Sequence, residues 1–121
     1  MNAMVLGEDL KPGTTEFDLF IKEATRAMTT KDGQKCTAVR RLLVPAKWVE
    51  DVQIALGQRL SGVIIGDPNV EGVRMGASAN KDQVKEVSEK VQESSKTQEI
   101  VFGNLDDFEV KGADKNKGAF I

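Results

Sequence analysis

Residues 16–45 read EFDLFIKEATRAMTTKDGQKCTAVRRLLVP and contain a helix pattern, a polar loop and a strand pattern in direct succession. In the first part, apolar residues recur every three or four positions. This spacing predicts a helix with one apolar face made of Phe17, Phe20, Ile21, Ala24, Ala27 and Met28. Asp32-Gly33 is expected to end this helix. The run VRRLLVP, residues 39–45, contains residues that favour strands and predicts a strand that ends at Pro45.

The sequence on either side of this stretch continues the alternation of strand and helix. AMVLG, residues 3–7, predicts a strand, and Thr14 or Thr15 can cap the helix that follows. After Pro45, apolar residues at helical spacing predict a second amphipathic helix over residues 48–60. Strands that alternate with helices favour an α/β fold, with layered helices on a mostly parallel sheet.

The C-terminal half predicts one more helix and one more strand. The side chain of Asn80 can cap the helix. The helix is expected to bury a face made of Val84, Val87 and Val91. EIVFG, residues 99–103, predicts a strand, and the polar, Gly-containing segment 104–118 is expected to form a long loop.

Both ends of the chain suggest part of a larger domain. It begins on a predicted strand and ends on the apolar GAFI, residues 118–121, whereas domains usually start and stop in polar linkers. We therefore expect residues 1–121 to be a single partial domain.

Composition excludes several kinds of chemistry. The chain has 121 residues, a formal net charge of -2, no histidine and one cysteine. Without histidine there is no Ser-His or Cys-His pair and no zinc site of the Cys/His type, so no metal is expected.

The basic residues are not gathered into one block of the sequence, which argues against a nucleic-acid partner. No apolar run reaches the roughly 20 residues of a membrane span and no secretory signal is evident, so the expected location is the cytoplasm.

Cys36 allows two interpretations. Free cysteines are often buried and act as small hydrophobic residues. Here, however, the cysteine lies in a polar loop between a helix and a strand, where a rigid scaffold can present a reactive group. The basic residues Lys31, Lys35, Arg40 and Arg41 would favour a nucleophilic thiolate. From these residues alone, the structural and the nucleophilic roles remain equally supported.

Other candidate residues have weaker claims. Arg40 and Arg41 could bind a phosphate of coenzyme A, although of two paired basic residues at the start of a strand, one is more often outward-facing and the other salt-bridged. Glu16 and Glu71 could act as a general base, but surface or helix-capping roles suit them better. Trp48 is expected to pack in the core.

Residues 16–45 resemble the cysteine segment of aldehyde dehydrogenases, in which the nucleophile lies in a Gly-Gln-x-Cys context. That context is here Gly33-Gln34-Lys35-Cys36. The segments GQKCTAVRR, GDPNVEGVRMGA and DQVKEVSEKV are similar to one branch of the family, the bifunctional phenylacetate-degradation type, which joins the dehydrogenase to an enoyl-CoA hydratase that opens an oxepin-CoA ring. A related branch acts on a CoA-linked semialdehyde in benzoyl-CoA degradation. The resemblance implies that Cys36 is the catalytic nucleophile.

In this family the cysteine thiolate attacks the aldehyde carbon to form a thiohemiacetal, which transfers hydride to NAD or NADP. The resulting thioester is hydrolysed to the acid by a glutamate-activated water. The resemblance implies that the glutamate, the oxyanion-binding asparagine and the nucleotide-binding and hydratase domains all lie outside this chain. We therefore expect a partial catalytic domain that is inactive alone and holds no bound cofactor.

The resemblance also implies an aldehyde substrate in the whole enzyme and assembly as a homo-oligomer. An alternative interpretation is a non-catalytic remnant or interaction module that keeps the fold without the activity.

Overall fold

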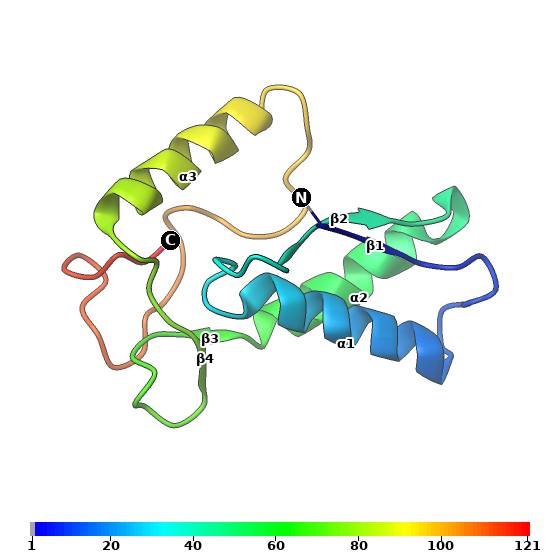
Figure 1. Ribbon diagram of the computed structural model, residues 1–121, viewed down its shortest axis with the longest axis horizontal. Helices are drawn as coiled ribbons and strands as arrows, with labels where there is room; N and C mark the ends of the chain where they lie inside the picture. Colours follow the sequence, from blue (N-terminus) through cyan, green and yellow to red (C-terminus); the bar gives the residue numbers. More distant parts are fainter. Residues whose placement is uncertain (1) are drawn as a thin grey trace. The chain divides into compact units, whose positions relative to one another are not determined.

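The structure is a computed structural model that describes residues 2–121 (Figure 1). Its elements in chain order are β1 (Asn2–Val5), α1 (Thr15–Thr29), β2 (Val39–Leu43), the 3-10 helix η1 (Ala46–Trp48), α2 (Val49–Ser61), β3 (Ile64–Ile65), β4 (Val73–Met75) and α3 (Lys81–Ser94). The chain forms two compact units, one ending at Val63 and the other beginning at Ile64. Helices combine with parallel strand pairs, as expected for an α/β fold.

In the first unit, β1 and β2 form a parallel pair that is connected through α1. Side chains of a strand alternate between its two faces. On β1, Met4 packs against the hydrophobic core, while its neighbour Val5 is 66% exposed. On β2, Leu42 packs inward and Leu43 is 54% exposed. The strand pair therefore has one face on the core and one exposed face, on which Val5 and Leu43 lie next to Ala3 and Arg41.

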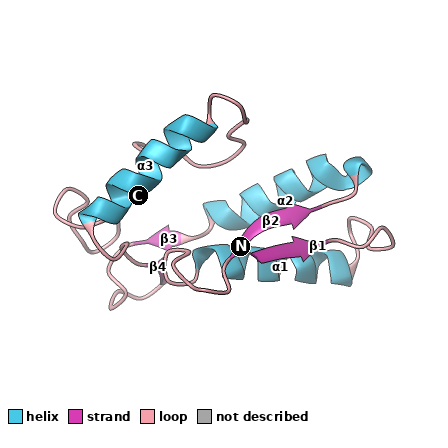
Figure 2. Cartoon of the chain, turned by 45° about the horizontal axis from the view of Figure 1, so that its top comes forward, coloured by secondary structure: helices cyan, strands magenta, loops and turns pink. Residues whose placement is uncertain are grey.

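Helices α1 and α2 pack together on the inner face of the β1–β2 pair (Figures 1 and 2). The buried centre of the unit consists of Leu6, Phe17, Phe20, Ile21 and Val52. Three of these residues come from the predicted apolar face of α1, and Trp48 packs against the cluster as expected. The periodicity of residues 17–24 thus identified the face of α1 that faces the core, with Ala27 and Met28 half-buried at its end.

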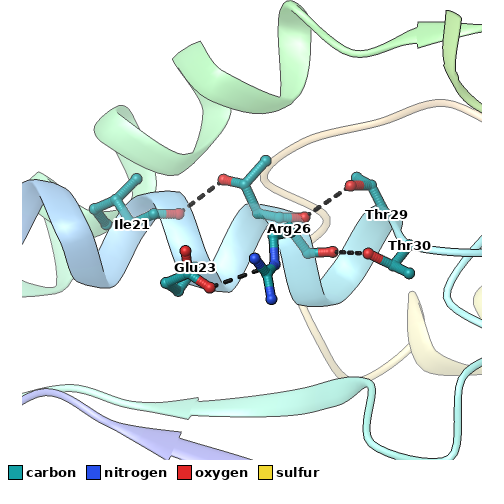
Figure 3. A network of polar contacts seen from close by, with 6 residues as sticks. Ile21, Glu23, Arg26, Thr29 and Thr30 are labelled. Carbon is teal, nitrogen blue, oxygen red and sulfur yellow. Dashed lines mark hydrogen bonds and ion pairs between the residues drawn. The ribbon is translucent and has the colours of Figure 1, made fainter.

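Side-chain hydrogen bonds define both ends of α1. Thr14 is the N-cap, and its hydroxyl accepts from the backbone N–H of Phe17 at 3.3 Å. Near the other end, Thr25 and Thr29 each donate a hydroxyl to the carbonyl four residues earlier, at 2.8 and 2.9 Å. Thr30, the C-cap, donates to the Arg26 carbonyl at 2.6 Å (Figure 3). These threonines occupy carbonyls of the last turns, so the chain leaves the helix at a defined point.

The second unit contains a shorter strand pair. β3 and β4 are parallel, and Gly66, just after β3, forms an isolated bridge with Lys111. The Lys111 N–H donates to the Ile65 carbonyl at 2.8 Å, and the Asp67 N–H donates to the Lys111 carbonyl at 2.9 Å. The ammonium of Lys111 also donates to the Glu71 carbonyl at 3.0 Å. The 104–118 segment is a loop, as predicted, but it also contributes this third extended piece.

Helix α3 begins as predicted, but its expected buried face was wrong. Asn80 caps the helix by accepting from the Gln83 N–H at 2.8 Å. Val84 and Val91 are only half-buried, however, and Val87 is exposed. The second unit has only short strands and loops to cover this face, so the valine stripe is incompletely packed.

The predicted strand over residues 99–103 was also wrong. The segment has no regular secondary structure, and Ile100, Val101 and Phe102 are 52%, 55% and 47% exposed. A segment with high β propensity forms a strand only where a neighbouring strand can hydrogen-bond to it. No strand pairs with residues 99–103 within residues 2–121.

None of the helices within residues 2–121 is long and apolar enough to cross a membrane.

Candidate catalytic cysteine loop

The loop between α1 and β2 begins with an unusual left-handed run. Lys31, Asp32 and Gly33 have φ angles of 54°, 55° and 68°. The Gly33 N–H donates to the Thr30 carbonyl at 3.1 Å and closes a tight turn over the first two of these residues. Left-handed backbone costs an L-residue roughly 1–2 kcal/mol, and such strain is concentrated at functional sites.

Both the backbone conformation and the close surroundings of position 33 require a glycine. A Cβ atom at this position would lie 3.1 Å from the Met28 carbonyl oxygen and 3.3 Å from Nη1 of Arg40. The backbone of Gly33 is buried between the end of α1 and the guanidinium of Arg40. Glycine therefore allows the loop to fold back against the helix that precedes it.

Cys36 lies at the corner of a second turn in the same loop. The Ala38 N–H donates to the Lys35 carbonyl at 2.9 Å, which places Cys36 and Thr37 at the two central positions. Cys36 is a free, exposed cysteine, while Ala38 is buried at 3% exposure. The chain therefore anchors one side of the turn in the interior and presents the thiol to solvent. This placement contradicts a role for Cys36 as a buried core residue.

Two side chains from the strand pair hold the loop by its carbonyl groups. The side-chain amide of Asn2 donates to the Cys36 carbonyl at 2.8 Å and to the Ala38 carbonyl at 3.4 Å. The guanidinium of Arg40 donates to the Gly33 carbonyl at 2.6 Å. Both halves of the loop are thus tied to the strands, although most of its residues are exposed.

An irregularity in the strand pairing explains how Arg40 reaches the loop. Asn2 lies opposite Val39, but the next residue of β1, Ala3, lies opposite Arg41. Arg40 is therefore the additional residue of a β-bulge, a feature that bends a strand and redirects a side chain. Its guanidinium turns back to Gly33, so one of the two arginines considered for phosphate binding has a structural role within this chain.

The other candidate residues belong to different elements of the chain. Arg41 is exposed on β2. Glu16 lies in the first turn of α1, where a carboxylate interacts favourably with the helix dipole. Glu71 belongs to the second unit. Among residues 2–121, no three histidine, cysteine or acidic residues are grouped so that they could hold a metal ion.

Asn2 is the residue of this site that the sequence did not reveal. It precedes the predicted strand by one position and lies 34 residues before Cys36. Only the parallel pairing of β1 with β2 brings its amide to the cysteine turn. No local pattern in the sequence encodes that contact.

The chain is similar to known proteins along most of its length. The profile of the aldehyde dehydrogenase family matches residues 13–121. The 3,4-dehydroadipyl-CoA semialdehyde dehydrogenase of Aromatoleum evansii is 43% identical over 121 residues, which cover 100% of this chain and 24% of that protein.

A solved structure has the same fold. It is the crystal structure of a cysteine-to-alanine mutant of aldehyde dehydrogenase C from Pseudomonas syringae in complex with NAD+ and octanal. It matches with a TM-score of 0.75 at 22% identity, over 98% of this chain and 22% of that one.

These matches extend over almost the whole chain and include the cysteine loop. The chain spans about a quarter of the length of the relatives it matches. The family and the fold follow from the same comparisons. The chain belongs to the aldehyde dehydrogenase family.

Proposed function

We propose that this chain is the cysteine-bearing part of the catalytic domain of an enzyme that oxidises a CoA-linked semialdehyde to the acid in aromatic catabolism. The observation that carries the proposal is the exposed Cys36 on a loop that is clamped to the strand pair through Asn2 and Arg40. The identity to the semialdehyde dehydrogenase of Aromatoleum evansii, along the full chain, supports this substrate class. The phenylacetate type, with a fused hydratase, is the more specific form of the proposal.

The step assigned to this chain is addition of the Cys36 thiolate to the aldehyde. The sulfur lone pair forms a C–S bond with the carbonyl carbon, and the C=O π electrons move to the oxygen, giving a thiohemiacetal anion. A backbone N–H near the sulfur could donate to this oxygen in the way that oxyanion sites do. The exposed position of Cys36 gives an aldehyde direct access to the thiol.

We expect no dinucleotide site among the described residues. Dinucleotide binding in Rossmann-type folds uses a Gly-rich turn between a strand and the N-terminus of a helix. Within residues 2–121, α1 and α3 instead begin after Thr14 and Asn80, and α2 follows a 3-10 turn. NAD or NADP, the hydride acceptor of the proposed reaction, would therefore be held by other parts of the enzyme.

A segment exchange tests the proposal. The matching segment of the Aromatoleum evansii enzyme is replaced by this chain, and formation of reduced cofactor is measured with 3,4-dehydroadipyl-CoA semialdehyde. We expect an active chimera, and a loss of activity of at least about 1,000-fold for Cys36→Ser, because an alcohol is far less nucleophilic than a thiolate. Thr37→Ser, which changes the exposed neighbour, is the matched control.

A Cys36→Ser chimera that is as active as the parent chimera would refute the nucleophile assignment. A chimera that oxidises simple aliphatic aldehydes but not the CoA-linked substrate would refute the substrate class alone.

A further inference from the structure

We propose that Asn2 is a positioning residue for Cys36, whose side-chain amide holds the cysteine turn in the one conformation from which the thiol is presented. This inference rests on the proposed function only where it calls Cys36 the nucleophile. The hydrogen bonds that carry it are a property of the chain itself.

The contacts place Asn2 against the backbone of the reactive residue. Its Nδ2 atom lies 2.8 Å from the carbonyl oxygen of Cys36 and 3.4 Å from that of Ala38. A side-chain amide has two N–H donors, so one group can serve both carbonyls. Fixing the Cys36 carbonyl restrains rotation about the Cα–C bond of the cysteine, which sets the direction of its Cα–Cβ bond relative to the strands.

The turn has a hydrogen bond on its other side as well. The Ala38 N–H donates to the Lys35 carbonyl, and the buried Ala38 side chain anchors the end of the turn. Asn2 is itself held because it lies opposite Val39 at the start of the β1–β2 ladder. The cysteine turn is therefore fixed between β2 and the first residue of β1.

A neutral amide suits this role better than other polar groups. A carboxylate at position 2 would face two carbonyl oxygens and would repel both. A lysine would bring a mobile ammonium and a positive charge to the site. Asn has only two side-chain torsions, so little conformational entropy is lost when it is held in place.

Positioning matters here because the thiol is exposed. Since Cys36 is exposed, neighbouring groups cover little of it, and the backbone is the principal determinant of where Sγ lies. A displacement of about 1 Å at a reacting group can reduce a rate roughly 100-fold. Loss of the Asn2 amide is therefore expected to reduce catalysis without removing any group that contacts the aldehyde.

The single cysteine makes a direct test possible. Labelling with ¹³C-cysteine gives one carbonyl and one Cβ resonance, because the chain has one cysteine. In the wild-type chain we expect both resonances to be single and sharp, with the carbonyl at a hydrogen-bonded position. In Asn2→Ala and Asn2→Asp at neutral pH we expect the carbonyl resonance to move upfield and the Cβ resonance to shift or broaden.

Asn104→Asp is the matched control. It makes the same chemical change and adds the same charge, but Oδ1 of Asn104 accepts from the N–H of Asp106 and Asp107, and a carboxylate can still accept. We expect this variant to leave both cysteine resonances unchanged. Fluorescence of Trp48, the only tryptophan, reports whether the first unit remains folded.

A pH titration separates the hydrogen bond from a general structural effect. Protonation of the carboxyl in Asn2→Asp supplies an O–H donor, so the carbonyl resonance should return toward its wild-type position at low pH. Asn2→Ala should show no such return. If either variant unfolds, a scalar coupling through the hydrogen bond between Nδ2 of Asn2 and the Cys36 carbonyl carbon tests the contact in the wild-type chain.

Each possible NMR result either supports or disproves the proposal that Asn2 positions the thiol. Unchanged carbonyl resonances in the folded variants, or absence of the coupling, would disprove the contact. A shifted carbonyl with an unchanged Cβ resonance would show that the contact does not orient the thiol, which also overturns the proposal. Neither readout involves an aldehyde or a cofactor, so a failure of the proposed function would be recognised separately.

Discussion

Gly33 holds the first half of the cysteine loop in a conformation that other residues adopt only with strain. Its φ angle is 68°, and the space that a Cβ would need is limited by the Met28 carbonyl and Arg40. Lys31 and Asp32 are left-handed as well, although they are not glycine. The surrounding structure must hold all three residues in place, and the Arg40 bond to the Gly33 carbonyl provides part of that restraint.

We expect Gly33→Ala to destabilise the first unit by more than about 1 kcal/mol, because alanine is strained at positive φ and would crowd the helix end. Gly62→Ala is the control, since Gly62 has a φ of -84° and its added Cβ would be 3.5 Å from the nearest atom, the Arg59 carbonyl oxygen. Urea unfolding followed by Trp48 fluorescence measures both variants. Equal unfolding free energies for the two would contradict the strain assigned to Gly33.

At the scale of an element, α1 connects the hydrophobic core of the first unit to the cysteine loop. Its apolar face supplies Phe17, Phe20 and Ile21 to the core, and its C-terminal end leads directly into the cysteine loop. Ile21 is 1% exposed, whereas Leu19, on the opposite face, is 54% exposed. The two residues offer a direct comparison of buried and exposed positions on one helix.

Truncation of these two residues should have different effects. We expect Ile21→Ala to lower the free energy of unfolding by about 2–5 kcal/mol, because it removes buried methyl groups and leaves a cavity. Leu19→Ala should change it by less than about 0.5 kcal/mol. Denaturant unfolding provides the comparison, and a similar loss for both would mean that α1 does not pack in solution as described.

Helix α3 carries an exposed ion pair near its C-terminal end. The Lys90 ammonium lies 2.8 Å from a carboxylate oxygen of Glu93. The hydrogen bond and the charge of Lys90 lower the pKa of Glu93, and the same contact with Glu93 raises the pKa of Lys90. Both charges are fully present at neutral pH, where the pair is intact.

The Lys90–Glu93 pair is weakened at both low and high pH, when one of its two charges is lost. Because the folded-state pKa of Glu93 is depressed, its contribution is present above the unfolded pKa and is lost as pH falls through the folded value. The contribution of Lys90 is present below its unfolded pKa and is lost as pH rises through the raised value. Carboxyl NMR titration should show Glu93 titrating at lower pH than it does in Lys90→Met. Identical titration curves in the two chains would disprove the pairing in solution.

The sequence predicted those elements whose formation depends on residues that are close together in the chain. The spacing of Phe17, Phe20 and Ile21 identified the core face of α1, and Thr14 and Asn80 marked helix starts because capping depends on residues three positions away. It failed for residues 99–103, where a strand would have needed a partner. It also missed Asn2, because the contact with Cys36 forms only when segments 34 residues apart are paired.

At the scale of the whole molecule, the outer face of the β1–β2 pair is the feature that remains to be explained. Val5 and Leu43 lie opposite each other in the ladder and are 66% and 54% exposed. A two-stranded parallel sheet also has two unpaired edges, and parallel sheets are usually covered on both faces. For the isolated chain the homo-oligomer stays a prediction, in which a second copy covers this surface in a symmetric homodimer.

Sedimentation equilibrium of the purified 13.2 kDa chain should therefore give the mass of a dimer. Val5→Lys should shift the equilibrium toward monomer, because it replaces an apolar contact of the exposed face with a charge. Leu19→Lys, which changes an exposed leucine of α1, should not. A monomer at high micromolar concentration would refute the proposed dimer, and equal dissociation by both variants would place the interface elsewhere.

The contact of Asn2 with Cys36 also has a consequence for the order of folding. Closing a loop of about 34 residues costs roughly 3 kcal/mol of chain entropy, which exceeds the roughly 1 kcal/mol that one amide–carbonyl bond contributes. The bond therefore cannot guide the two segments together, and it must form after α1 has docked and paired the strands. The thiol should acquire its final orientation late, beyond the rate-limiting barrier. Removal of the Asn2 amide should accordingly speed unfolding and leave the rate of folding almost unchanged.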